Sequence, residues 1–110
     1  MTPFDQDVAA LRIGFIGAGR LGTALAWSFA QHGLRVGAVA SMIASDAQKL
    51  AAPIAGCAVM ADGQQVVDGS DLVFVTTPDG AIADTAAQFR WRQGVAAVHC
   101  SGVTDRKSVV

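Results

Sequence analysis

The chain has 110 residues, a formal net charge of −1, 52% apolar residues and 15% charged residues. This length suits one domain, and the near-neutral charge without a basic patch argues against a nucleic-acid partner. No apolar run approaches the length of a membrane span, whereas the surplus of apolar residues predicts surface that a second copy or a further domain covers.

The N-terminal segment and the few cysteines and histidines bear on compartment and metal binding. Residues 1–7 are acidic and lack the basic stretch of a secretory signal peptide, so we expect a cytoplasmic protein. Cys57 and Cys100 lie far apart and outside any CxxC spacing, which predicts two buried thiols. His32 and His99 belong to no cluster with metal-ligand spacing, and we expect no metal.

The first predicted elements are a strand at residues 11–16 and a helix at residues 20–32, after a loose tail at residues 1–10. Gly33 is a natural stop for this helix. Apolar residues at helical spacing predict one helix face that lies on a sheet, and they are Leu21, Ala24, Leu25, Ala26 and Phe29.

A glycine-rich run, GFIGAGRLG, occupies residues 14–22 between this strand and this helix. In its GxGxxG spacing, Gly17 allows a sharp turn, Gly19 lets a pyrophosphate approach the backbone, and Gly22 lets the helix pack closely on the strand. Free N–H groups and the dipole at the helix start favour the negative charge of phosphates. The run predicts a dinucleotide site, and the alternative is a tight strand–helix turn without a ligand.

The second strand, predicted at residues 34–40, has the small apolar residues of a buried parallel strand. It leads to Ser41, where an NAD site usually places an acid for the ribose 2′-hydroxyl. The missing acid favours NADP and argues against a methyltransferase, although Met42 stands where a cation would neutralise the 2′-phosphate. Arg20 and Lys49 are the nearest cations in the sequence, and the alternative for each is a solvated side chain.

Three short elements are predicted next. A Ser-x-x-Gln capping box that begins at Ser45 opens a helix, and Pro53 closes it. A weak strand follows at residues 57–60. Asp62 then caps a second short helix, which Gly69 ends.

The fourth predicted strand, residues 71–76, runs into the sequence TTPD. We expect Thr76 and Thr77 to contact the pyrophosphate or the nicotinamide ribose through their hydroxyl and N–H groups. The Pro-Asp pair that follows fits a turn and the cap of a helix at residues 80–91.

The fifth predicted strand, residues 94–99, ends in His99-Cys100-Ser101-Gly102. His99 is a candidate acid or base near a nicotinamide, and the alternative is a satisfied structural residue. Cys100 has no neighbour in the sequence that would depress its pKa, so it is not a candidate nucleophile. We expect a frayed tail at residues 104–110.

Strands that alternate with helices predict parallel pairing with right-handed crossovers. We expect an α/β fold with a doubly wound parallel sheet of the Rossmann type, in the strand order 3-2-1-4-5, in a single domain at residues 11–103. The cofactor would cross the carboxyl edge between strands 1 and 4. The predicted cofactor-binding residues are Gly17, Ala18, Gly19, Arg20, Leu21, Gly22, Ser41, Thr76, Thr77 and Pro78.

Four segments together resemble a known group: residues 14–25, Ser41, residues 71–79 and residues 99–102. They are similar to the Rossmann-like N-terminal domain of the DUF2520 group. They also resemble coenzyme F420-dependent NADP oxidoreductases, pyrroline-5-carboxylate reductases and 6-phosphogluconate dehydrogenase-like enzymes. The resemblance covers residues 11–103. It implies NADP binding through Gly17, Gly19, Arg20, Gly22 and Ser41, although relatives often have Ser-Arg where this chain has Ser41-Met42.

The resemblance also implies a helical domain after the fifth strand, which completes the substrate pocket and usually a dimer. Because the chain stops at Val110, we expect an NAD(P)-binding domain of an oxidoreductase that is incomplete as an enzyme on its own. The alternative is a non-catalytic nucleotide-binding module that senses the cofactor or mediates dimerisation.

Overall fold

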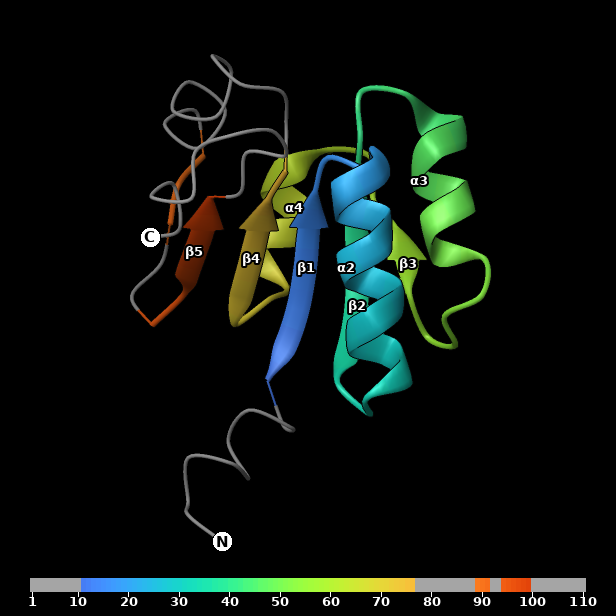
Figure 1. The fold of residues 1–110 in the computed structure, drawn as a ribbon. Coiled ribbons are helices and arrows are strands. Elements are labelled where there is room, and N and C mark those ends of the chain that lie inside the picture. The colour runs from blue at the N-terminus through green and yellow to red at the C-terminus, as the bar shows by residue number, and fades with distance from the viewer. Residues whose placement is uncertain (1–10, 77–88, 92–93, 100–110) are drawn as a thin grey trace, which may run out of the picture.

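In the part of the chain that the structure describes, parallel strands form one sheet in the order β3-β2-β1-β4-β5 (Figure 1). The computed structural model describes residues 11–76, 89–91 and 94–99. The elements are β1 (Arg12–Ile16), α2 (Arg20–Gln31), β2 (Arg35–Ala40), α3 (Ala44–Ala51), β3 (Ala58–Val59), α4 (Gly63–Asp68), β4 (Leu72–Val75) and β5 (Ala96–His99). The predicted doubly wound sheet and its strand order are confirmed.

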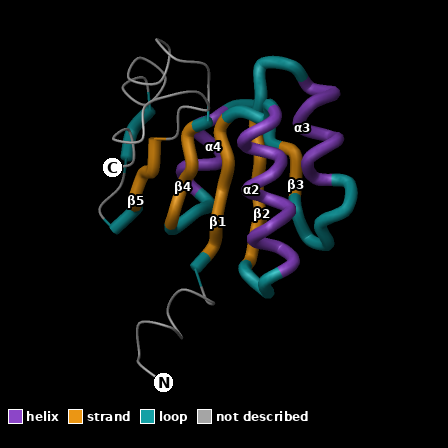
Figure 2. The backbone as a smooth tube through the Cα atoms, in the orientation of Figure 1, coloured by secondary structure: helices purple, strands orange, loops and turns teal. Residues whose placement is uncertain are grey.

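Helices cover both faces of the sheet (Figure 2). Helices α2 and α3 pack on one face and α4 on the other (Figure 1). Because side chains alternate along a strand, Phe15 of β1 lies in the cluster with Ala26 and Leu50, whereas Ile16 lies in the cluster with Val66. The central strands are therefore buried on both faces, as parallel strands usually are.

Three aromatic rings lock α2 onto the centre of the sheet. Phe15 stacks on Phe74 of β4 with ring centroids 5.3 Å apart, and Phe29 of α2 lies 6.1 Å and 5.1 Å from these two rings. The most deeply buried residues of α2 are small, Gly22 and Ala26. Helix and sheet therefore approach closely along this pair, while bulkier side chains flank it.

The predicted apolar face of α2 is therefore only partly correct. Leu25 and Phe29 pack against the core as expected, but Ala24 is exposed. The helix ends as predicted at Gly33, which has φ +84°. The N–H of Leu34 donates to the carbonyl oxygen of Phe29 at 3.0 Å, as in a Schellman motif.

A bulge in β2 keeps its apolar residues facing the core. Ile13 pairs with Val36 and Gly14 pairs with Ala38, so Gly37 is an extra residue in the register. Val36 and Val39, three residues apart, consequently face the same cluster. The carboxyl half of β2 is thus aligned with the carboxyl half of β1.

An ion pair joins the amino ends of β1 and β4. The Arg12 guanidinium donates to both carboxylate oxygens of Asp71 at 3.1 Å, and the Arg12 N–H donates to one of them at 2.9 Å. The hydrogen bond to Asp71, and then its charge, raise the pKa of Arg12. The Arg12 side chain therefore joins β1 to β4.

The predicted capping box at Ser45 is wrong, and the cap predicted at Asp62 is confirmed. Helix α3 starts one residue before Ser45, after Ile43, and it has no side-chain cap. Helix α4 is capped by Asp62, whose side chain accepts a hydrogen bond from the N–H of Gln65 at 3.0 Å.

Parts of the prediction fall outside the described residues. The helix expected at residues 80–91 is described at 89–91 alone, and these residues are not helical. The expected tails at 1–10 and 104–110 also lie outside. Within the described ranges, no helix has the length and apolar character needed to cross a bilayer.

Candidate functional site

The glycine turn leaves β1 at the carboxyl edge of the sheet and leads straight into α2 (Figure 1). Gly17 has φ +100°, a left-handed conformation that favours glycine. Its N–H donates to the carbonyl oxygen of Ala40 at 2.8 Å, which ties the turn to the last residue of β2. The motif therefore has the strand–turn–helix setting that a phosphate-binding turn requires.

Thr76, the residue after β4, holds the glycine turn through two hydrogen bonds. Its N–H donates to the carbonyl oxygen of Ile16 at 2.9 Å, and its hydroxyl donates to that of Gly17 at 3.1 Å. A Cβ at Gly17 would lie 3.1 Å from the backbone carbonyl of Thr76, and one at Gly22 would lie 2.6 Å from its Oγ1. The protein's own packing thus requires both glycines, and a cofactor contact by Thr76 stays a prediction.

Gly19 has a different environment. Its backbone is extended, with φ −77° and ψ −162°, and it is the N-cap of α2. A Cβ at Gly19 would meet nothing within 4 Å. No contact in the described part of the protein therefore requires glycine at this position, and the space beside it is open to a ligand.

The amino end of α2 offers donors to that space. The helix has no side-chain cap and no acidic residue in its first turn. Its first backbone bond runs from the N–H of Thr23 to the carbonyl oxygen of Gly19 at 2.9 Å. The N–H groups of residues 20–22 precede that bond and have no acceptor within the helix. Together with the helix dipole, they are suited to the oxygens of a pyrophosphate.

The loop after β2 reaches the same edge but carries no cation. The Oγ of Ser41 accepts a hydrogen bond from the N–H of Ile43 at 3.2 Å. The Met42 side chain is fully exposed, and that of Ile43 is 57% exposed. The loop thus presents one hydroxyl and two apolar side chains.

A cavity of about 470 Å³ adjoins the glycine turn and extends between α2 and α3. Charged side chains from both helices line it, with Arg20 on α2 and Asp46 and Lys49 on α3. The lining residues are Ala18, Gly19, Arg20, Thr23, Ala24, Trp27, Asp46 and Lys49. The two cations that the sequence singled out therefore share one cavity.

Three polar or aromatic residues of this cavity were not predicted from the sequence. Thr23 and Trp27 lie three and seven positions after Arg20, on the same face of α2, and this helical spacing was a usable signal. The Trp27 indole N–H donates to the carbonyl oxygen of Leu50 at 3.0 Å and so ties α2 to α3. Asp46 enters the cavity through the packing of α3 on α2, which no local pattern reveals.

The ends of β4 and β5 lie side by side at the carboxyl edge. Val75 pairs with His99, so the backbone of His99 stands next to the strand that leads to Thr76. The side chain of His99 lies outside the described part of the structure, as do Thr77, Pro78 and Cys100. A catalytic role for His99 stays a prediction.

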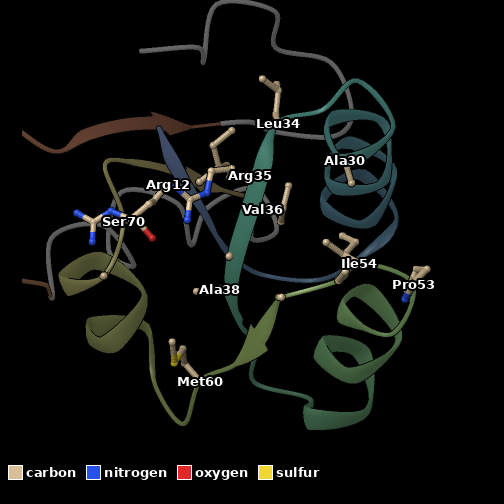
Figure 3. Close-up of a pocket in the computed structure, with 15 residues that line it drawn as sticks. Arg12, Ala30, Leu34, Arg35, Val36, Ala38, Pro53, Ile54, Met60 and Ser70 are labelled. Atoms are coloured by element: carbon tan, nitrogen blue, oxygen red, sulfur yellow. The ribbon is translucent and has the colours of Figure 1, made fainter. Parts of the chain in front are cut away.

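A larger hollow, of about 590 Å³, lies at the opposite end of the strands (Figure 3). Arg12 and Arg35, at the amino ends of β1 and β2, line it together with the segment around Pro53. Ligands of open parallel sheets bind outside the carboxyl ends of the strands. This hollow lies at the amino ends of the strands, and the guanidinium of Arg12 is already paired with Asp71. The hollow is therefore not the candidate cofactor site.

The described residues offer little to metal or thiol chemistry. They contain no group of three or more potential metal ligands. Cys57 is partly buried, and this burial raises the pKa of its thiol. A thiol with a raised pKa is a poor nucleophile near neutral pH, and Cys57 packs against the core under α2 and α3.

Comparison with protein families gives one match that spans most of the chain. The family model described as "NADP oxidoreductase coenzyme F420-dependent" matches residues 12–101. No curated protein matches the chain significantly.

Several solved structures that share this fold are described as oxidoreductases. A Bacteroides fragilis protein assigned as an NADP oxidoreductase is 27% identical, with a TM-score of 0.76 over 88% of this chain. An imine reductase variant from Myxococcus stipitatus, in complex with NAD+, is 26% identical, with a TM-score of 0.69 over 86% of this chain. A reductive aminase from Aspergillus terreus, in complex with NADPH, is 23% identical and shares the fold with a TM-score of 0.70 over 86% of this chain. The present chain spans 38%, 31% and 33% of these three proteins.

Proposed function

The chain belongs to the coenzyme F420-dependent NADP oxidoreductase family, and we propose that it binds NADP(H) in preference to NAD(H) as the cofactor domain of an oxidoreductase. One observation carries the proposed dinucleotide site: within the glycine turn, Gly17 and Gly22 are required by the fold, whereas Gly19 borders open space. The fold does not require glycine at position 19, but a ligand would, because a pyrophosphate can approach the backbone closely only where no Cβ is present.

The residues of the turn fit the pyrophosphate of a dinucleotide. Gly19 leaves room for it, and the N–H groups of residues 20–22 supply donors at the positive end of α2. Ala18, within the turn, is buried, and its carbonyl oxygen accepts a hydrogen bond from the Thr23 hydroxyl at 3.3 Å. These contacts keep the turn in one shape, so little ordering would accompany binding.

The nicotinamide half would extend toward β4 and β5. When bound, a nicotinamide cofactor supplies a hydride donor or acceptor. We assign Thr77 and Pro78 to the cofactor-binding segment after Thr76, and we propose His99 as the acid or base beside the reacting group. The substrate pocket would be completed by a helical domain or a second copy of the chain.

The preference for NADP(H) rests on the end of β2. Ser41 stands where NAD sites usually have a carboxylate, so a 2′-phosphate would meet no negative charge at this residue. Relatives do not point to a single choice, because one is described in complex with NAD+ and another in complex with NADPH. Titration calorimetry with NADPH and NADH tests the preference directly, and absence of binding by both at millimolar concentrations would refute the proposed function.

Gly19→Asp is the sharpest test of the phosphate site. Asp is a favoured N-cap, so we expect a free energy of unfolding equal to or above that of the wild type. Its carboxylate would repel the pyrophosphate, and we expect NADPH to bind at least about 30-fold more weakly. Calorimetric titration gives the dissociation constant, and urea denaturation gives the stability.

Gln31→Glu is the matched control, because it adds the same charge at the far end of α2. It should leave the dissociation constant within about twofold of the wild type, since the charge would be far from the ligand and screened by salt. Equal NADPH affinity in Gly19→Asp and the wild type would mean that the turn is structural alone.

A further inference from the structure

The cavity between α2 and α3 extends from the glycine turn to the first turn of α3, which follows the loop after β2. It shares Gly19 and Arg20 with the glycine turn, and Asp46 belongs to the helix that begins three residues after Ser41. In doubly wound folds the adenosine ribose lies between the glycine turn and the end of the second strand. The cavity is therefore placed to receive the ribose and whatever its 2′-oxygen carries.

The charges of this cavity are available to a ligand. In the described residues, Arg12 and Asp71 form an ion pair, but the side chains of Arg20, Asp46 and Lys49 form neither an ion pair nor a hydrogen bond. Arg20 and Lys49 are exposed, and Asp46 is half-buried. Two cations and one carboxylate thus line one cavity without an ion pair among them.

These charges oppose one another in their effect on the cofactor. A guanidinium and an ammonium both favour a phosphate dianion, and a guanidinium can donate two parallel hydrogen bonds to it. A carboxylate repels the phosphate and accepts a hydrogen bond from an unmodified ribose hydroxyl. The loop after β2 adds no cation, because Met42 and Ile43 occupy its exposed positions.

We propose that Arg20 and Lys49 bind the 2′-phosphate of NADP(H) in the α2–α3 cavity, and that Asp46 limits the preference over NAD(H). This inference rests on the proposed function and names the residues that decide its cofactor. The specificity determinants thereby lie on two helix faces, and the loop after β2 contributes the Ser41 hydroxyl alone. Asp46 makes the preference for NADP(H) moderate.

Adenosine 2′,5′-bisphosphate and adenosine 5′-diphosphate isolate the 2′-phosphate from the rest of the cofactor. Titration calorimetry at constant ionic strength measures both ligands, and NADPH and NADH, against the full chain. We expect Arg20→Gln to weaken 2′,5′-bisphosphate and NADPH about 10-fold, and Lys49→Gln about 3-fold to 5-fold. Both variants should bind NADH within about twofold of the wild type.

We expect Asp46→Asn to change the NADPH affinity in the opposite direction to Arg20→Gln in the same assay. Removing the carboxylate should tighten NADPH about 3-fold to 10-fold and weaken NADH about 3-fold. Arg35→Gln is the control for net charge, because Arg35 lies at the amino end of β2, in the hollow on the opposite side. It should change no affinity by more than about twofold, and thermal denaturation should show that all four variants are folded.

Three outcomes would overturn the inference. Equal loss of NADPH and NADH affinity in Arg20→Gln would place Arg20 on the pyrophosphate. Equal effects of Arg35→Gln and Arg20→Gln would mean that long-range charge accounts for the change. Unchanged NADPH affinity in Asp46→Asn would remove Asp46 as a determinant. If the wild type binds neither cofactor, the proposed function itself is wrong, which is a distinct result.

Discussion

At the scale of single residues, the three glycines of GxGxxG have different reasons to be glycine. Gly17 needs its left-handed φ and Gly22 needs its missing Cβ, because Thr76 lies directly against both. Gly19 has neither constraint and borders the proposed phosphate site. The motif thus combines two residues that build the turn with one that admits the ligand.

Gly22→Ala should lower the free energy of unfolding by about 1–3 kcal/mol. The new Cβ would lie 2.6 Å from Oγ1 of Thr76 and 2.9 Å from the Gly17 carbonyl oxygen, and such overpacking outweighs the gain in helix propensity. Urea denaturation measures the change. Gly19→Ala is the matched control, and a poorer N-cap should cost it no more than about 1 kcal/mol. A larger loss in Gly19→Ala than in Gly22→Ala would contradict this view of the turn.

At the scale of elements, α4 shows how a six-residue helix is specified. The Asp62 side chain accepts a hydrogen bond from the N–H of Gln65 at 3.0 Å, and the Gln65 side chain accepts one from the N–H of Ala61 at 2.9 Å. This reciprocal pair resembles the capping box that the sequence suggested at Ser45. Val66 and Val67 are fully buried and anchor the helix on the sheet.

Asp62→Ala should cost about 1 kcal/mol of stability, since it removes the cap of α4. Ser45→Ala should cost nothing or stabilise slightly, because Ser45 lies inside α3 and alanine is the better helix former. Denaturant midpoints at equal slopes give both values. A loss in Ser45→Ala as large as that in Asp62→Ala would show that α3 begins at Ser45 after all.

At the scale of the whole molecule, one sheet supports two separate hydrophobic layers. Phe15 and Leu50 belong to the layer of α2 and α3, whereas Val66 and Val73 belong to the layer of α4. Because β1 and β4 contribute side chains to both layers, loss of either layer exposes the other face of the same strands. The two layers should therefore unfold together.

The two tryptophans can test this cooperativity, because they report on different layers. Trp27 bonds to the carbonyl oxygen of Leu50, and Trp91 packs against the α4 layer. In Trp91→Phe and in Trp27→Phe, the fluorescence of the remaining tryptophan should give the same urea midpoint as far-UV circular dichroism. Separate midpoints in either variant would mean that one layer melts independently.

Much of the fold follows from the sequence, because its signals are local. The alternation of apolar strands with helices predicts the strand order that the structure has, and Gly33 and Asp62 mark a helix end and a helix start correctly. The predicted start of α3 at Ser45 is wrong because a second local signal competes with it. The Oγ of Ser41 accepts a hydrogen bond from the N–H of Ile43, and this turn makes Ile43 the N-cap, so that α3 begins at Ala44.

For the site, the sequence by itself determined the glycine turn, its setting between a strand and a helix, and the missing acid at Ser41. Each of these depends on residues within a few positions of one another. The tertiary structure decided which glycines the fold needs, because Thr76, after β4, lies against the turn. It also decided which charged residues line one cavity, because the packing of α3 on α2 brings Asp46 to the same cavity as Arg20. Such contacts depend on how elements pack, and this packing is set by the whole core.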